Sequence, residues 1–238
     1  MGNMAQKSFP IILLALGTLL QVTPAPLRAL SLESGGLVPV SIPTGSESLT
    51  MLQEANLDGI GVPESLSLAS GILTIFSGNM IDWQSPSDWN IIQAAIADLN
   101  HDGQPEVVLL LWRPFKTWPV DQWLPNGGRI ADFHDANGQS CHIILVGWRS
   151  NGYRELWAGS AMADPISAFA AADLNGDNIQ ELVALEGRYT DSRSAPARIL
   201  KVWKWNGFGF AVVSSLDGVF DKMTLVQAID GHVVILVP

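Results

Sequence analysis

Short apolar runs bounded by Asp, Asn, Gly and Pro recur along most of the chain, and this pattern predicts an all-β protein. Apolar residues at 94–97 and 107–111 flank one acidic segment, and apolar residues at 169–172 and 182–185 flank a second. We expect these runs to be strands. Each acidic segment is then a loop between two neighbouring strands.

The two acidic segments, residues 97–106 and 172–181, have nearly the same sequence. Each places oxygen-bearing side chains at loop positions 1, 3, 5 and 9. This spacing suits Ca2+, because the ion takes about six to eight oxygen ligands from a loop that curls around it. A backbone carbonyl at position 7 would add another oxygen. The candidate ligands are Asp98, Asn100, Asp102, Gln104 and Glu106 in the first loop, and Asp173, Asn175, Asp177, Ile179 and Glu181 in the second.

Two other interpretations apply to such loops. An EF-hand needs an acidic residue at position 12, where this chain has Leu109 in one copy and Ala184 in the other. Asp, Asn and Gly also form ordinary turns that hold no metal. The agreement of two copies at four positions favours calcium over simple turns.

Two further segments are weaker copies of the same pattern. Residues 55–64 align with 97–106 without a gap but have Ile60 at position 5, so we expect this loop to be structural or weakly occupied. Residues 226–232 keep the apolar entry but have only a short Asp-Gly turn. That turn predicts a tight hairpin without a metal site.

A second marker alternates with the acidic loops. Residues 148–152 and 203–207 both end an apolar run with Asn-Gly, and residues 77–79 are a weaker counterpart. Asn-Gly is a strong hairpin signal. The distance from each hairpin to the next acidic loop is nearly constant, whereas the distance from loop to hairpin varies. This predicts repeated four-stranded antiparallel units in which the length variation lies between the second and third strands.

Repeated units of this kind are typical of β-propeller blades. We therefore expect a small β-propeller of about four antiparallel blades, or a partial propeller, with Ca2+ loops between the first two strands of a blade. Residues 37–42 could pair with the incomplete last unit, residues 224–237, and so close the ring.

The acidic loops resemble the FG-GAP/VCBS repeats of the integrin-alpha type of β-propeller, whose metal loops read Asp-x-Asp/Asn-x-Asp-Gly-x-x-Asp/Glu. Residues 98–106 match every defined position of this pattern, and residues 173–181 differ only at Asn178. The resemblance covers roughly residues 50–238 and is specific at these two loops. It implies the fold, bound calcium and an extracellular setting, and it implies no particular activity.

The N-terminal region predicts export. Lys7 precedes an apolar run at 9–22, which is shorter than the roughly 20 residues of a membrane-spanning helix. We expect a signal peptide at 1–29, a linker with a possible ring-closing strand at 30–49, and the propeller domain at 50–238. The mature protein would be periplasmic, at the cell surface or secreted, without a membrane span. An uncleaved N-terminal anchor is the alternative.

Composition narrows the partners. The formal net charge of −10 repels phosphate backbones, so nucleic acid is not an expected partner. Cys141 is the one cysteine and cannot form a disulfide within the chain. Neighbouring strand residues face opposite sides. Cys141 and His142 are therefore not expected to act as a nucleophile and its base, and Cys141 should be a buried apolar residue.

The longest connection, residues 113–140, and a second one, residues 187–197, should lie on the face opposite the calcium loops. Aromatic side chains beside guanidinium groups suit a glycan or an extended peptide. The tryptophans of the long connection could instead only fix it to the blade. The candidate ligand-binding residues are Arg113, Trp118, Trp123, Arg129, His134, Arg188 and Tyr189.

The leading functional prediction is an exported calcium-binding module or scaffold for a protein or glycan, which could assemble as a homo-oligomer. The alternative is a hydrolase or lyase that uses the 113–140 face, where Asp132, His134 and Asp135 form the one cluster that resembles acid–base chemistry. A third possibility is a structural accessory of an envelope complex. No nucleophile elbow, phosphate-binding Gly-Lys loop or His-Glu-x-x-His motif occurs in the chain, and no catalytic residue is assigned.

Overall fold

A computed structural model describes residues 26–117 and 132–238. This part of the chain is all-β and contains no helix. Its strands form four antiparallel sheets, one of five strands and three of four. The prediction of an all-β protein is therefore confirmed. Because the described residues contain no helix, they also contain none long and apolar enough to cross a membrane.

Three of the sheets are meanders of four consecutive strands. Their acidic loops join the first strand to the second, and their hairpins join the third strand to the fourth, as the repeat pattern predicts. The length variation lies between the second and third strands, also as expected. The first meander comprises β4 (Glu54–Ala55), β5 (Glu64–Ala69), β6 (Ile72–Ser77) and β7 (Met80–Gln84). The second comprises β8 (Asn90–Ala97), β9 (Glu106–Pro114), β10 (Gln139–Trp148) and β11 (Tyr153–Ala158). The third comprises β12 (Ile166–Ala172), β13 (Glu181–Glu186), β14 (Ala197–Trp205) and β15 (Phe210–Phe220).

The five-stranded sheet joins strands from the two ends of the described chain. Its order is β2 (Gly36–Val40), β1 (Arg28–Glu33), β17 (Val233–Val237), β16 (Thr224–Gln227) and β3 (Glu47–Ser48). Residues 37–42 do not pair with the last unit as predicted. β1 pairs with β17, and β2 pairs only with β1. The physical reason is burial, because the middle four residues of β1 are all buried while β2 stays half-exposed.

The start of β1 overlaps the end of the expected signal peptide. Arg28 pairs with Val237, and Ala29, which is 2% exposed, pairs with Leu236. Removal of residues 1–29 would take away the first two residues of this strand. The rest of the expected signal segment, residues 1–25, lies outside the described residues.

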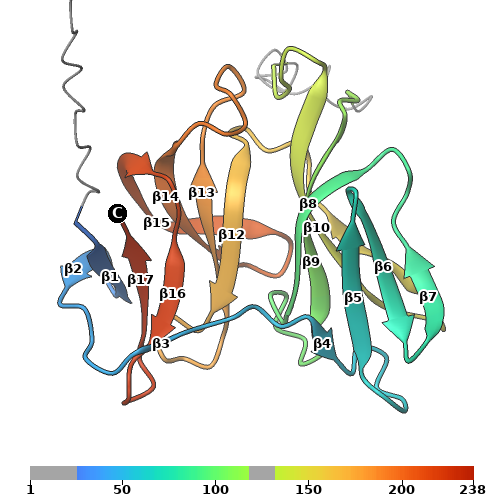
Figure 1. Ribbon diagram of the computed structural model, residues 1–238, viewed down its shortest axis with the longest axis horizontal. Helices are drawn as coiled ribbons and strands as arrows, with labels where there is room; N and C mark the ends of the chain where they lie inside the picture. The colour runs from blue at the N-terminus through green and yellow to red at the C-terminus, as the bar shows by residue number, and fades with distance from the viewer. Residues whose placement is uncertain (1–25, 118–131) are drawn as a thin grey trace, which may run out of the picture.

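The four sheets stand side by side in Figure 1, from the five-stranded sheet at the left to the β4–β7 sheet at the right. β8 lies against β5 and β6 on one side and against β12 on the other, and β12 also lies against β16. The segment at 49–52 crosses between the outer two sheets (Figure 1). Leu49 donates its N–H to the Leu225 carbonyl in β16 of the five-stranded sheet, and Leu52 forms a bridge with Ile96 in β8 of an inner sheet.

The core lies in layers between neighbouring sheets. β9 contributes side chains to two of these layers. Residues 107–111 are all fully buried, which accounts for an apolar run without polar alternation. Successive side chains of a strand point to opposite faces. Val107, Leu109 and Leu111 face the layer shared with the β4–β7 sheet, while Val108, Leu110 and Trp112 face the layer shared with the β12–β15 sheet.

Candidate functional site

The three acidic loops share a buried glutamate at position 9. Each glutamate opens the second strand of its meander and is 0% exposed. Each carboxylate accepts a hydrogen bond from the backbone N–H of the buried leucine at loop position 2, so a buried carboxylate fixes the start and end of each loop. The pairs are Glu64 with Leu57 (2.6 Å), Glu106 with Leu99 (3.2 Å) and Glu181 with Leu174 (3.0 Å).

The loop at 98–106 curls through hydrogen bonds from its own backbone. Asn100 Oδ1 accepts from the N–H of Asp102 at 2.9 Å, and Asp102 Oδ1 accepts from the N–H of Gln104 at 3.0 Å. Asp98 Oδ2 accepts from the N–H of Gly103 at 3.0 Å. Gly103 has φ +83°, which glycine reaches without steric cost. The loop therefore turns at position 6, as predicted.

Two carboxylates in this loop have unfavourable surroundings. Asp98 Oδ1 is buried and has no hydrogen-bond partner. Burial raises the pKa of Glu106 to about 8, and the negative charge of Asp98 adds to that effect. A cation between the two groups would offset both the burial of charge and the repulsion. The donor set of this loop therefore fits a divalent ion.

The loop at 173–181 has the same shape with different partners. Asp173 accepts hydrogen bonds from the N–H groups at 176–178. The Asn175 side-chain nitrogen lies 3.1 Å from Glu181 Oε1 and 3.3 Å from Asp177 Oδ2. Burial raises the pKa of Glu181. Asn178 has φ +63° and so supports the turn that glycine makes in the first loop.

In these two loops, a basic side chain from the hairpin segment of the same sheet reaches the aspartate at position 5. Arg149 Nη2 lies 2.5 Å from Asp102 Oδ2, and Lys204 Nζ lies 2.6 Å from Asp177 Oδ2. Lys204 is also 3.6 Å from Glu181 Oε1, and its hydrogen bond holds the pKa of Asp177 below its usual value. Sequence reasoning missed both residues, although they occupy the same place, directly after the tryptophan that opens each Asn-Gly hairpin segment.

These contacts limit how the loops could hold a metal. Within residues 26–117 and 132–238, no group of three or more His, Cys, Asp and Glu side chains is arranged to hold an ion. An ion would therefore need the asparagine at position 3 and backbone carbonyls as well. The first loop fits best because Asp98 Oδ1 is unused. In the second loop the Lys204 ammonium lies against both Asp177 and Glu181 and would compete with an ion, whereas in the first loop Arg149 pairs with Asp102 and leaves Asp98 and Glu106 to the ion.

The third loop, at 56–64, has no carboxylate at position 5, where Ile60 is 68% exposed. Asp58 Oδ1 accepts from the Ile60 N–H at 2.6 Å. Glu64 Oε1 is buried without a partner. The expectation of a structural or weakly occupied loop stays a prediction.

The first two loops touch each other through Gln180. Its side-chain oxygen accepts from the backbone N–H of Asp98 at 3.0 Å, and its carbonyl lies 3.1 Å from His101 Nε2. His101 therefore contacts the neighbouring loop. This contact arises because β8 and β12 lie side by side, a relation that the sequence of either loop does not contain.

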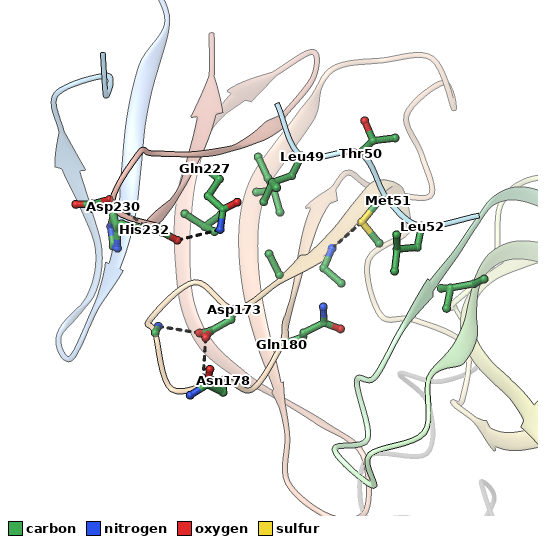
Figure 2. Close-up of a pocket in the computed structure, with 17 residues that line it drawn as sticks. Leu49, Thr50, Met51, Leu52, Asp173, Asn178, Gln180, Gln227, Asp230 and His232 are labelled. Atoms are coloured by element: carbon green, nitrogen blue, oxygen red, sulfur yellow. Dashed lines mark hydrogen bonds between the residues drawn. The ribbon is translucent and has the colours of Figure 1, made fainter. Parts of the chain in front are cut away.

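A pocket of about 640 Å³ opens beside the second loop (Figure 2). Its walls come from loop 173–181, the crossing segment at 49–52 and the turn at 228–232. Figure 2 shows Met51 and Leu52 on one side, with Gln227, Asp230 and His232 on another. The pocket lies on the acidic-loop side of the sheets, whereas the sequence directed attention to the opposite face.

On that opposite face, the predicted residues are only partly brought together. Trp118, Trp123 and Arg129 lie outside the described residues. The Tyr189 hydroxyl donates to the Met162 carbonyl at 2.8 Å and accepts from the Cys141 N–H at 3.1 Å, so it joins backbone segments. Arg188 is exposed.

In the described part of the chain, the side chains of Asp132, His134 and Asp135 form no hydrogen bond with one another. His134 Nδ1 lies 2.8 Å from the backbone carbonyl of Asp135. The Asp135 side chain pairs with Arg193 at 2.5 Å. Burial tends to raise the pKa of Asp135, but hydrogen bonds from Arg193 and from the N–H groups of Gln139 and Asn137 outweigh it and hold this pKa below its usual value.

Cys141 and His142 face opposite sides, as predicted. Cys141 is fully buried, and burial raises the pKa of its thiol to about 12. Its sulfur lies against the backbone of Ile166, whereas the His142 ring contacts Ser140 and Gly159. The pair has no nucleophile–base contact.

Comparison with protein-family models and with curated protein sequences finds no match for this chain.

Proposed function

We propose that the four sheets are the blades of a small β-propeller stabilised by Ca2+, and that the exported protein is a binding module or scaffold for a protein or glycan. Three features of the architecture support the propeller. Inner sheets bury both faces against neighbours. β12 lies next to β8 on one side and β16 on the other, so neighbouring sheets approach through these strands. Strands from the two ends of the described chain share one sheet, which a complete or a partial propeller can accommodate.

One observation carries the calcium proposal: the Asp98 oxygen that is buried without a partner beside a buried Glu106. Asp98, Asn100, Asp102 and Glu106 would hold the ion in the first loop together with the Gln104 carbonyl. The bound ion would supply positive charge that links the ends of β8 and β9. The second loop would use Asp173, Asn175, Asp177, Glu181 and the Ile179 carbonyl, after Lys204 moves away.

The test is calorimetric titration of the full chain with Ca2+ and, separately, Mg2+. We expect Ca2+ to bind and to raise the melting temperature, with Asp98→Asn abolishing the tighter of two binding events. Asp221→Asn, an exposed acid outside the loops, is the matched control and should titrate like the unmodified protein. No heat of binding and no thermal shift with Ca2+ would refute the calcium proposal.

A separate experiment addresses the binding role. Peptide and glycan arrays probed with the full chain, in Ca2+ and in chelator, should identify a ligand class whose capture weakens when the metal is removed. Retention of no ligand in either condition would contradict a binding module and favour a purely structural role.

A further inference from the structure

We propose that a pocket at the end of β9, opposite the calcium loops, binds a carboxylate group. The pocket has a volume of about 270 Å³ and is lined by Arg113, Lys116, Asp88, Trp89 and His142 among others. Arg113 lies seven residues along β9 from Glu106, which for an extended strand is roughly 23 Å. Carboxylate binding specifies the ligand class for the binding role proposed above and rests on that role. The geometry of the pocket does not depend on calcium.

The guanidinium of Arg113 is the centre of the pocket. It lies 5.9 Å from the centroid of the buried Trp89 ring, a cation–π arrangement that holds the planar group in place. Within the described residues, Arg113 has no carboxylate within 4.0 Å. Burial of this cation is unfavourable and lowers its pKa, and the negative charges of Glu155 and Asp88 only partly offset that effect from beyond ion-pair distance. An incoming anion would offset that cost.

His142 forms a fixed wall beside the guanidinium. It is 4% exposed, and its Nδ1 lies 3.4 Å from Arg113 Nη2 and 3.2 Å from the Gly159 carbonyl. The carbonyl can only accept, so it is satisfied when Nδ1 carries the proton. Nε2 then accepts from the Ser140 hydroxyl at 2.7 Å. This arrangement satisfies the ring without the ligand and leaves the guanidinium donors free for an anion.

The charged groups that line the pocket favour an anion as the ligand. Burial, followed by the charge of Arg113, lowers the pKa of His142 to about 4, so the ring is neutral at pH 7. Arg113 and Lys116 are positive and Asp88 is negative, while Glu155 acts from further away. The lining is therefore locally positive in a chain whose net charge is −10. A planar carboxylate matches the guanidinium fork through two parallel hydrogen bonds.

Two sources could supply that carboxylate: an acidic peptide side chain or an acidic sugar. The experiment is a calorimetric titration of the full chain at constant ionic strength with acetate, N-acetylglutamate amide and glucuronate. Chloride and methyl glucoside serve as blanks, and sulfate and phosphate test other anions. We expect saturable binding of the carboxylates, and the tighter of the two larger compounds identifies the source.

The variants distinguish a loss of carboxylate binding from a loss of folding. Arg113→Gln should weaken binding at least tenfold, and Arg113→Lys should weaken it less, because the charge remains without the fork. Lys116→Gln changes an exposed residue and should weaken binding about threefold, by analogy with an exposed ion pair. Lys222→Gln, an exposed cation outside the pocket, should bind as before. Melting curves check that each variant is folded.

The outcomes separate this proposal from the calcium proposal, because each titration is run in Ca2+ and in chelator. Carboxylate binding that persists in chelator supports the pocket even if no calcium binds. Titrations that match chloride, or equal binding by the Arg113 and Lys116 variants, would overturn it. Binding of sulfate or phosphate without carboxylates would show that the ligand class is wrong.

Discussion

The charge state of Glu106 predicts that, without metal, Glu106→Gln lowers the stability of the fold at low pH and raises it at high pH. The glutamate is 0% exposed, and its pKa is raised from 4.5 to about 8, first by burial and then by Asp98. Between these pH values the unfolded chain releases its proton while the folded chain keeps it. Stability without metal therefore falls as pH rises from 4.5 to 8, by on the order of 5 kcal/mol in total for this group.

Glu106→Gln removes this titration and, in the ionised state, the buried charge. In chelator we expect the variant to be less stable than the unmodified protein at pH 5, because the Leu99 and Asn100 N–H groups lose part of their acceptor. At pH 9 the variant should be the more stable of the two. In saturating Ca2+ the difference at pH 9 should narrow, since a ligand at 100 times its Kd adds about 2.7 kcal/mol to a protein that binds it, roughly half of the loss through Glu106.

Urea unfolding at pH 5, 7 and 9, with and without Ca2+, measures these differences. Asp221→Asn is the control and should follow the unmodified protein throughout. Asp98→Asn should shift the pH dependence of the unmodified protein downward, because it removes the second cause of the raised pKa. Equal slopes with pH for Glu106→Gln and the unmodified protein would refute the reasoning.

Three other substitutions test contacts at the two edges of the sheets. Lys204→Gln should cost at most about 1 kcal/mol in chelator and should tighten Ca2+ binding by calorimetry, because the ammonium no longer competes for Asp177; weaker binding would contradict this. Gln180→Ala should cost about 0.5–1.5 kcal/mol and make the two calcium-binding events independent, whereas unchanged coupling in the titration would exclude a link through Gln180. His142 has a folded pKa near 4 against 6.5 when unfolded, so stability should fall as pH decreases from 6.5 to 4; His142→Gln should lack that slope in urea unfolding, and an unchanged slope would assign it to other groups.

Local sequence determined the strands, the turns and the strand order of the three meanders. The acidic loops and hairpins lie where Asp, Asn and Gly predict them, because turn chemistry acts over a few residues. The apolar run at 107–111 is a buried strand, because successive side chains point to opposite faces and all of them are apolar. Burial of Cys141 was also predicted, because a free cysteine behaves as a small hydrophobic residue. The repeat of four strands could be read from spacing alone, because each unit is one continuous stretch of chain.

Tertiary structure decided which of these elements meet. β1 pairs with β17 across almost the whole chain, and Lys204 reaches a carboxylate loop that precedes it by a full strand pair. Arg113 obtains its pocket from Trp89 and His142, which belong to other strands and connections. Such contacts depend on how much surface each pairing buries and on where a sheet places its edges. Neither quantity is encoded in the residues next to the contact.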